Sequence, residues 1–220
     1  MGLFVVFEGV EGSGKSTQAR ALKRRLTKTG YRATLIHEPG GTPTGERIRR
    51  WLKGDHDISP LSELFLFSAA RAPLVASVIS PALDRGEVVV CDRYTYSTVA
   101  YQGSGRGLEP EMIRQVNEIA SGGLMPELVV LLDLSPSHGL SRKSGKPLDR
   151  IEQEGNGFHQ RVRQAYLAMA REEPDRWCVI DVTKPAYEVG EIVWRRVQEK
   201  MRQQATGDQG AGTRREGITG

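Results

Sequence analysis

Nine residues near the start of the chain have the types and spacing of a phosphate-binding loop. They are Gly9, Val10, Glu11, Gly12, Ser13, Gly14, Lys15, Ser16 and Thr17, which fit the pattern G-x-x-x-x-G-K-[ST]. Glycines let successive backbone N–H groups turn toward one anion, and the start of the following helix adds further N–H groups. Lys15 would reach the β- and γ-phosphates of a nucleoside triphosphate such as ATP, and the Ser16 hydroxyl would help to hold Mg²⁺. The alternative is a Gly/Ser-rich turn that carries a lysine by chance.

Asp92 and Arg93 follow a run of apolar residues and form a second charged pair. A carboxylate at the end of a central strand is where phosphate-loop enzymes hold Mg²⁺ or its waters, although an aspartate there can also cap the next helix. The guanidinium of Arg93 is costly to bury without an anion, and its planar fork suits a phosphate. We therefore expect Asp92 beside the metal and Arg93 beside a phosphate.

Several residues point to a second ligand. Glu11 lies inside the loop, where a carboxylate would repel the donor phosphates unless it faces another molecule. Phe67 and Arg71 are four residues apart and share one helix face, so a ring and a guanidinium could stack on a base and hydrogen-bond its edge. For Phe67 by itself core packing is the favoured interpretation, and Tyr101 and Gln102 are ambiguous alone.

The stretch 142–150 is basic, contains glycine, serine and proline, and separates two predicted helices. A closing cover, or lid, is one interpretation, because phosphoryl transfer needs cationic charge on the migrating group and exclusion of water. A solvated surface loop is the other.

The elements that must position these residues follow from the hydrophobic pattern. Apolar runs predict five strands, at 3–7, 33–38, 87–91, 127–134 and 177–181. Helical spacing predicts helices over 16–29, 44–52, 60–83 (kinked or divided at Pro73), 96–101, 110–121, 136–142, 158–170 and 186–203. The alternation predicts an α/β class with a parallel sheet in a three-layer sandwich. Ligands then gather at the carboxyl ends of the strands, so Glu8, Glu38, Asp92 and Asp181 should face one crevice.

Length and composition bound the remaining possibilities. The 220 residues suit one large domain, which we expect over 1–204 with its lid at about 142–157. Glycine, glutamine and arginine dominate the end of the chain, so 205–220 should be a disordered tail. Cys91 and Cys178 each lie in an apolar run and are expected to be reduced thiols.

The formal charge of +4 is mild, and acidic and basic residues are interleaved. This argues against a general nucleic-acid binder. No stretch approaches the roughly 18 consecutive apolar residues that span a bilayer, and no signal peptide precedes the first strand. We therefore expect a cytoplasmic protein with neither membrane nor nucleic acid as a partner.

Taken together, the motifs resemble those of bacterial thymidylate kinases. The matching segments are 8–18 (EGVEGSGKSTQ), 38–42 (EPGGT), 67–71 (FSAAR), 92–94 (DRY), 100–103 (AYQG), 105–107 (GRG) and 148–152 (LDRIE). They occur in family order and cover about residues 3–200. The resemblance implies transfer of the ATP γ-phosphate to dTMP, giving dTDP and ADP for dTTP biosynthesis, with Mg²⁺ and in a homodimer. It also implies the P-loop NTPase fold with a five-stranded parallel sheet in the order 2-3-1-4-5.

The resemblance assigns roles by position. For the donor, it implies that Lys15 binds the ATP phosphates within the loop 9–17, that Ser16 lies near Mg²⁺, and that Lys184 borders the adenine. For the acceptor, it implies contacts from Glu11 to the deoxyribose 3′-OH, Arg93 to the phosphate, Phe67 and Arg71 to thymine, Pro39, Thr98 and Gln102 near the nucleoside, and Tyr101 near the sugar 2′ position.

The family divides by the position of its catalytic arginine. Small residues at Gly12 and Ser13 place this chain in the group whose lid supplies the charge, which implies that Arg142 and Arg150 act with Lys15 and Arg93. Arg150 could instead be structural, paired with Asp149 or Glu152. The chain departs from the family in carrying His37 before Glu-Pro-Gly-Gly-Thr, where arginine is usual. Lysines also stand at 143 and 146 in a lid that is a residue shorter than in enterobacterial relatives.

Other functions remain open at this stage. Another nucleoside monophosphate kinase would share most of these motifs. A deoxynucleoside kinase would need a carboxylate base for a substrate hydroxyl, whereas Arg93 and the basic lid suit an acceptor that is already a phosphate. An ATPase switch binds no second nucleotide, so Phe67 and Arg71 would have no assigned role in it. The chain also has no Asn-Lys-x-Asp motif of the kind that recognises guanine.

Overall fold

The computed structural model describes residues 2–54, 57–142 and 148–212. Its strands are β1 (Leu3–Glu8), β2 (Ala33–His37), β3 (Val88–Asp92), β4 (Leu128–Asp133) and β5 (Trp177–Asp181). They form one sheet in the order β2-β3-β1-β4-β5, and every neighbouring pair is parallel. The predicted class, strand positions and strand order are confirmed.

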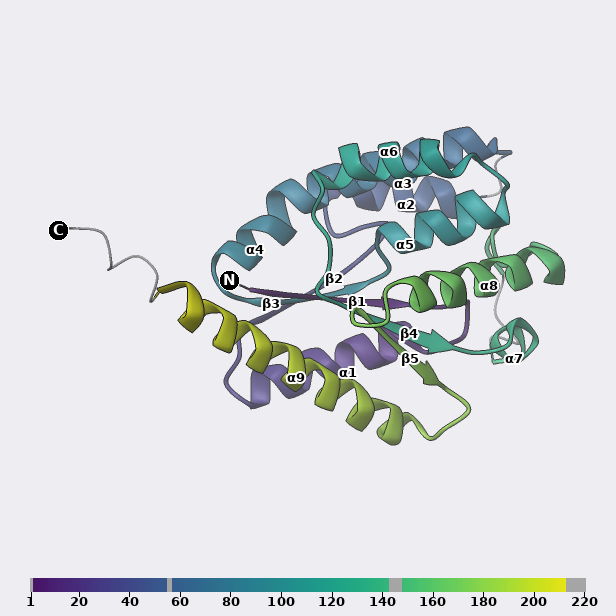
Figure 1. The fold of residues 1–220 in the computed structure, drawn as a ribbon. Coiled ribbons are helices and arrows are strands. Elements are labelled where there is room, and N and C mark those ends of the chain that lie inside the picture. Colours follow the sequence, from purple (N-terminus) through teal and green to yellow (C-terminus); the bar gives the residue numbers. More distant parts are fainter. Residues whose placement is uncertain (1, 55–56, 143–147, 213–220) are drawn as a thin grey trace.

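Helices cover both faces of this sheet. They are α1 (Lys15–Lys28), α2 (Pro43–Lys53), α3 (Pro60–Leu74), α4 (Ser80–Asp84), α5 (Thr95–Thr98), α6 (Pro110–Ser121), α7 (Pro136–Ser141), α8 (Asn156–Glu172) and α9 (Ala186–Gly212), with π-helical segments η1 (Val75–Ile79) and η2 (Val99–Gly105). Figure 1 shows α1 and α9 together on one face, and α3, α5 and α6 on the other. This arrangement is the predicted three-layer sandwich.

The central strand β1 shows why the sheet needs continuously apolar sequences. All six of its residues are buried. Leu3, Val5 and Phe7 belong to the hydrophobic cluster that includes α1 and α9, whereas Phe4 and Val6 pack in the cluster on the α3 and α4 side. Because successive side chains of a strand point to opposite faces, a strand covered on both faces must be apolar at every position. Each such buried side chain contributes about 1.5–3 kcal/mol of transfer free energy.

The long helix predicted over 60–83 is divided, as expected from Pro73. The α3 helix ends one residue after this proline, and the π-helical turn η1 then leads into α4. The whole segment Pro60–Asp84 has the length and mean hydropathy of a membrane-spanning helix, a weak indication because core helices of globular domains share both properties. In the structure it packs on the sheet through Leu74 and Ile79 and carries the buried charged residue Arg71.

Two predicted boundaries are wrong. Residues 103–105, expected to begin a loop, continue the helix as η2, because the glycines there permit close packing, with Gly105 against the Phe158 ring. The last helix was expected to end near Gln203, yet α9 runs to Gly212. Gln203, Gln204 and Ala205 are good helix formers, and no proline follows them to stop the helix. Residues 213–220 lie outside the described part.

The register brings the strand ends to one edge of the sheet. Phe7 and His37 both lie opposite Asp92, and Asp133 lies opposite Asp181. The loops that follow β1, β2 and β3 therefore leave the sheet side by side. Both cysteines are free thiols, as predicted, with Cys91 buried in β3.

Candidate active site

A cavity of about 740 Å³ opens at the carboxyl ends of the strands. The predicted site residues that line it are Glu11, Gly12, Gly14, Lys15, Ser16, Thr17, Pro39, Phe67, Arg71, Asp92, Arg93, Thr98, Tyr101, Gln102 and Arg142. One part, here called the phosphate-loop end, comprises residues 9–17 with Asp92. The opposite part, the α3 end, comprises Phe67, Arg71, Thr98 and Gln102. Glu11, Arg93 and Tyr101 lie between the two ends.

Some predicted residues do not line this cavity. Gly9, Val10 and Ser13 belong to the loop but are not among the lining residues, while Lys184 is exposed and Arg150 contacts Glu63. Asp181, expected in the crevice, is also exposed, and its carboxylate accepts a hydrogen bond from the Thr183 N–H at 2.9 Å. The strand end of β5 is therefore farther from the site than those of β1, β2 and β3.

The phosphate-binding loop takes the shape that its glycines allow. Gly14 is the N-cap of α1 with φ 92°, and Gly12 has φ 72°, a left-handed conformation that glycine adopts without strain. A Cβ on Gly12 would lie 2.0 Å from the carbonyl oxygen of Gly139 in α7, and a Cβ on Gly139 would lie 2.2 Å from that of Glu11. Small residues are therefore needed here because α7 packs directly on the loop.

Lys15 is buried against its own loop. Its Nζ donates to the carbonyl oxygens of Gly9 at 2.9 Å and Val10 at 2.8 Å, and to Ser13 Oγ at 3.4 Å. Burial lowers the pKa of Lys15 to about 8, an effect that Arg93 reinforces and nearby carboxylates oppose. The amine thus lies among oxygens beside an anion site, and a negative charge bound there would stabilise its protonated form.

The next two predicted residues form a direct pair. Ser16 Oγ, in the first turn of α1, donates a short hydrogen bond to Asp92 Oδ2 at the end of β3. A hydroxyl and a carboxylate that meet at the mouth of a phosphate-binding loop are both oxygen ligands of the kind that Mg²⁺ prefers. The sequence placed these residues together from the strand-end rule, and the structure brings them into contact.

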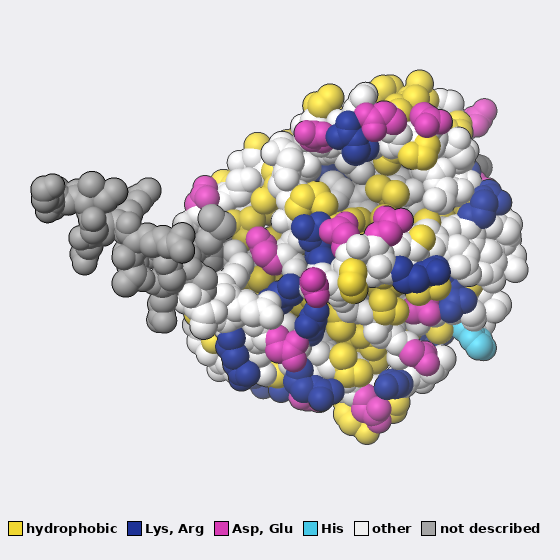
Figure 2. Space-filling model, in the orientation of Figure 1, with side chains coloured by type: hydrophobic (Ala, Val, Ile, Leu, Met, Phe, Trp, Pro, Cys, Tyr) yellow, Lys and Arg dark blue, Asp and Glu magenta, His cyan; other side chains and the backbone are white. Residues whose placement is uncertain are grey.

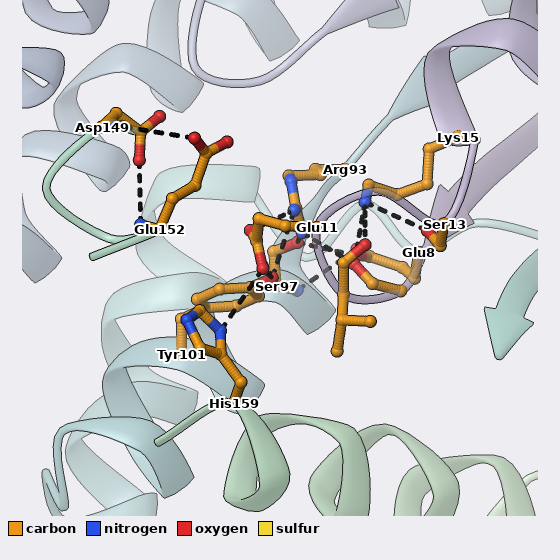
Figure 3. A network of polar contacts seen from close by, with 12 residues as sticks. Glu8, Glu11, Ser13, Lys15, Arg93, Ser97, Tyr101, Asp149, Glu152 and His159 are labelled. Atoms are coloured by element: carbon orange, nitrogen blue, oxygen red, sulfur yellow. Dashed lines mark hydrogen bonds and ion pairs between the residues drawn. The ribbon is translucent and has the colours of Figure 1, made fainter. Parts of the chain in front are cut away.

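Arg93 and Glu11 form the centre of the network in Figure 3. Arg93 Nη2 donates to Glu11 Oε1 at 2.8 Å and to the Tyr101 hydroxyl at 3.1 Å. The Tyr101 hydroxyl also lies 2.7 and 2.8 Å from the two Glu11 oxygens. Burial opposes ionisation of Glu11, but Arg93 and Lys15 hold the pKa of this carboxyl below its usual value. Glu11 thus pairs with Arg93 and Tyr101, and its contact with a second ligand stays a prediction.

Two buried residues lie behind this network: Glu8, which was expected to face the crevice but is not among its lining residues, and His159, which was not predicted. Glu8 accepts hydrogen bonds from the Tyr94 N–H, the Ser97 hydroxyl and the Tyr166 hydroxyl at 2.9, 2.6 and 2.8 Å, and burial raises its pKa. His159 in α8 is also buried, with Nδ1 3.6 Å from Glu11 Oε2. Glu8 at a strand end was a visible signal, but nothing in the local sequence marks His159.

The α3 end is built around a buried guanidinium. Arg71 Nε donates to Glu38 Oε2 at 2.8 Å, Nη1 to Asn117 Oδ1 at 2.6 Å and Nη2 to Thr98 Oγ1 at 2.9 Å. The Arg71 and Glu38 side chains are only 1% and 4% exposed. Phe67, one turn before Arg71, lines the cavity with it and is absent from the buried clusters. The predicted pair of ring and guanidinium therefore faces one open space.

The basic residues near the lid divide between two positions. Arg142 lines the cavity and its Nη2 donates to the Val182 carbonyl oxygen at 3.0 Å. Arg150 Nη2 instead contacts Glu63 Oε2 in α3. The expected structural partners, Asp149 and Glu152, are thus replaced by Glu63, which the sequence did not single out. Lys143 and Lys146 lie outside the described residues.

The unusual histidine at position 37 also has a local explanation. His37 Nε2 lies 3.2 Å from Glu46 Oε1, and both side chains are half-exposed. Arg49, one turn beyond Glu46 in α2, lines the cavity and donates from Nη1 to the Pro39 carbonyl oxygen at 2.9 Å. Arg49 and Lys53 of α2 are therefore cations on this side of the cavity that sequence reasoning missed.

Comparisons with known proteins agree with this geometry. The family model described as Thymidylate kinase matches residues 7–193. The chain is 50% identical over 200 residues to a thymidylate kinase of Dehalococcoides mccartyi, covering 90% of this chain and 96% of that protein. It is 49% identical over 202 residues to one from Deinococcus radiodurans, covering 90% and 98%. The crystal structure of thymidylate kinase from Ehrlichia chaffeensis is similar with a TM-score of 0.73 and 30% identity, covering 88% of this chain and 97% of that one. The chain belongs to the thymidylate kinase family.

Proposed function

We propose that this protein transfers the γ-phosphoryl group of ATP to dTMP, giving ADP and dTDP for dTTP synthesis. The observation that carries the proposal is the continuity of one cavity, in which a phosphate-binding loop faces an aromatic ring and a guanidinium across a shared arginine. A donor and an acceptor nucleotide bound at the two ends would bring their phosphates together near Arg93. Family membership supports the same reaction.

The phosphate-loop end holds the donor. The loop N–H groups and the start of α1 surround the β- and γ-phosphates, and Lys15 turns from the loop carbonyls toward them. Arg142, held near Val182, adds a cation over the donor from the lid side. Lys184 follows on the same loop and borders the adenine from the outside.

Mg²⁺ fits the residues present. Ser16 and Asp92 offer a hydroxyl and a carboxylate in contact with each other. Within the described residues no group of three His, Cys, Asp or Glu side chains is arranged to hold a metal by itself, so the ion would be shared with substrate phosphates and water. When bound, Mg²⁺ neutralises charge that develops on the phosphate oxygens.

The acceptor half needs no general base, because a phosphate monoester is already an anionic nucleophile. Arg93 binds and orients that phosphate, while Glu11 faces the 3′-OH of the sugar and Tyr101 closes the 2′ side. Phe67 stacks on the base, Arg71 and Gln102 meet its edge, and Pro39 and Thr98 complete the wall. The salt bridge from Arg93 holds the Glu11 carboxylate, which removes the free base that a deoxynucleoside kinase would use.

The lid completes the site by excluding water. Arg142 and Arg150 lie at the two ends of residues 142–150, and each contacts the body of the domain. We assign Arg142 to stabilisation of the transferring group. Arg150 acts at the same step only after it leaves Glu63, and its catalytic role stays a prediction.

A homodimer is the second part of the proposal. The helices α3 and α6 pack side by side and expose Leu61, Phe65, Met112 and Ile119, of which Phe65 is 53% and Ile119 82% exposed. Leu61 and Phe65 are four residues apart in α3, and Met112 and Ile119 are seven apart in α6, so each pair lies on one helix face. Figure 2 shows hydrophobic side chains interspersed with charged ones over α6. A second copy of the chain would cover this surface, because it carries the same apolar face.

The variants Phe65→Glu and Ile119→Glu should then convert the dimer to monomers, as measured by light scattering. A wild-type monomer would contradict the proposal.

The decisive experiment measures ADP release from ATP and Mg²⁺ with dTMP, dUMP, dCMP, dGMP, AMP or thymidine offered separately. We expect the highest kcat/KM with dTMP. Faster turnover with thymidine would indicate a deoxynucleoside kinase, faster turnover with another monophosphate would reassign the substrate, and equal ADP release without any acceptor would indicate an ATPase. Cytoplasmic location is the expectation that accompanies a nucleotide-synthesis enzyme.

A further inference from the structure

Glu63 is a buried carboxylate that joins three separate parts of the chain. It lies in the first turn of α3 with 0% of its side chain exposed. Gln102 Nε2 in η2 donates to Glu63 Oε1 at 2.6 Å, and Arg106 donates from Nε at 3.3 Å and from Nη2 at 3.2 Å. Arg150 beside the lid contacts Oε2. None of these contacts was expected from the sequence.

The chemistry of the carboxylate fixes which end of the Gln102 amide faces it. A carboxylate offers only acceptor oxygens, so the NH₂ group of the amide must point at Glu63. The guanidinium groups of Arg106 and Arg150 also donate to this carboxylate, so its other contacts among the described residues are with donors too.

The other end of the amide is then available to the cavity. Gln102 lines the cavity beside Phe67 and Arg71. Among the described residues none donates a hydrogen bond to Gln102 Oε1, and this oxygen is not one of the enclosed polar atoms that lack a partner. The α3 end thus presents one fixed acceptor, the Gln102 carbonyl, next to the donors of Arg71.

We propose that Glu63 is a positioning residue that sets base selectivity through Gln102. The inference rests on the proposed function and deepens it. A base that pairs with this edge needs a ring N–H for Gln102 and a carbonyl oxygen for Arg71, which thymine and uracil provide. Cytosine presents a lone pair at the ring nitrogen and an amino group beside it, so both contacts would become repulsive.

The two arginines explain why the carboxylate can be buried. An unpaired charge in the interior would be strongly unfavourable, and Arg106 with Arg150 supplies the compensation. If Glu63 were neutral and able to donate, the Gln102 amide would lose the constraint that orients it. Selectivity would then fall even though Phe67 and Arg71 were unchanged.

The test compares dTMP with 5-methyl-dCMP, which has the same methyl group and sugar and differs only at the base-pairing edge. Wild-type protein should prefer dTMP strongly. Glu63→Gln, which keeps the shape and can either donate or accept, should reduce the dTMP/5-methyl-dCMP ratio of kcat/KM about tenfold or more while the KM for ATP changes by less than about twofold. Gln102→Leu, which removes the acceptor and leaves Glu63 with its arginines, should reduce the same ratio.

The matched control is Arg150→Met, which breaks the lid contact to Glu63 but leaves Glu63 beside Gln102. It should lower kcat and keep the ratio within about twofold of wild type. If Glu63→Gln does not fold by circular dichroism, the double variant Glu63→Gln with Arg150→Met carries the measurement, because it removes one buried cation with the buried charge.

Three outcomes separate the hypotheses. A wild-type protein that does not prefer dTMP overturns the proposed function itself. A wild-type preference that survives in both Glu63→Gln and Gln102→Leu overturns only the role of Glu63. An equal loss of selectivity in Arg150→Met would show that lid contact, and not the orientation of Gln102, controls the choice of base.

Discussion

The two ends of the cavity are built in different ways. The phosphate-loop end consists mainly of backbone groups from nine successive residues, and its one buried cation, Lys15, contacts oxygens of the same loop. The α3 end consists of side chains, and Arg71 alone is held by partners 33, 46 and 27 residues away in sequence. An anion site can be made locally because backbone N–H groups are always present. A base-reading site needs particular side chains, which only distant elements can hold in place.

This difference predicts how each end responds to mutation. At the phosphate-loop end, removing a side chain should change catalysis with little effect on folding. At the α3 end, Glu38 and Arg71 are an ion pair in the interior, and Glu38 Oε1 already lacks a partner among the described residues. Removing one member of such a pair costs about 3–5 kcal/mol. Function and stability should therefore be coupled there.

The largest effect on catalysis is expected from Lys15→Ala. The loss of the ammonium group from the donor phosphates should lower kcat roughly 10²- to 10³-fold, as for removal of one charge-stabilising donor in other sites. The melting temperature should stay close to that of wild type. Lys28→Ala, an exposed lysine at the end of the same helix, is the control and should retain full activity. An unchanged kcat in Lys15→Ala would contradict the role of the loop.

Arg71→Ala tests the other end of the comparison. The KM for dTMP should rise about tenfold or more while the KM for ATP is spared, and unfolding free energy should fall by about 3–5 kcal/mol in urea titrations because Glu38 is left unpaired. Burial raises the pKa of the Glu38 carboxyl. As the pH falls, this carboxyl becomes protonated and the variant loses its unpaired buried charge, so the difference in unfolding free energy between variant and wild type should become smaller. Arg47→Ala, at an exposed position of α2, serves as the control. A defect confined to ATP would mean that the base site is misplaced.

Gly139→Ala would show that even the phosphate-loop end has one tertiary requirement. Its Cβ would lie 2.2 Å from the Glu11 carbonyl oxygen, so α7 or the loop must move, at a cost of about 1–3 kcal/mol. We expect lower stability and a weaker KM for ATP. Gly157→Ala, inside the first turn of α8, is a matched control because a Cβ there would meet only Arg161 Nη1, at 3.8 Å. If the two variants behaved alike, the contact between α7 and the loop would be unimportant.

The smallest effect is a proton linked to ATP binding. The pKa of Lys15 is about 8 before the phosphates arrive, and nearby negative charge should raise it. Binding at pH 8 should therefore take up about half a proton more than in Lys15→Arg, whose side chain stays charged. ATP affinity of the wild type should weaken as the pH rises through 8. Calorimetry in buffers of different ionisation enthalpy measures the uptake; equal values for the two proteins would place the Lys15 pKa elsewhere.

Much of the fold could be predicted because its signals are local. Continuous apolar runs such as 3–7 and 87–91 identified the central strands, and Pro73 identified the break in the long helix. The less accurate predictions were at boundaries where packing overrides local preference, such as the glycine-containing η2 and the end of α9. The strand order came from the resemblance, since no single run of residues encodes which strands become neighbours.

The site divides in the same way. Ser16 and Asp92 were predicted together because the carboxyl ends of parallel strands meet at one edge. The partners of Arg71, Arg150 and Glu11 were not, because Asn117, Glu63 and His159 lie on helices whose local sequences look like ordinary helix. Only their convergence in space gives them a role.

By itself, the sequence determined the class of fold and the family and predicted the anion site, because these depend on short motifs and on periodic burial. Tertiary structure determined which partners the charged residues of those motifs contact. It turned Glu11 toward Arg93 and Tyr101, engaged Arg150 with Glu63, and buried Arg71 on Glu38. The physical reason is that a buried charge must find a counter-charge within hydrogen-bonding distance, and the choice of partner depends on which elements the fold brings together.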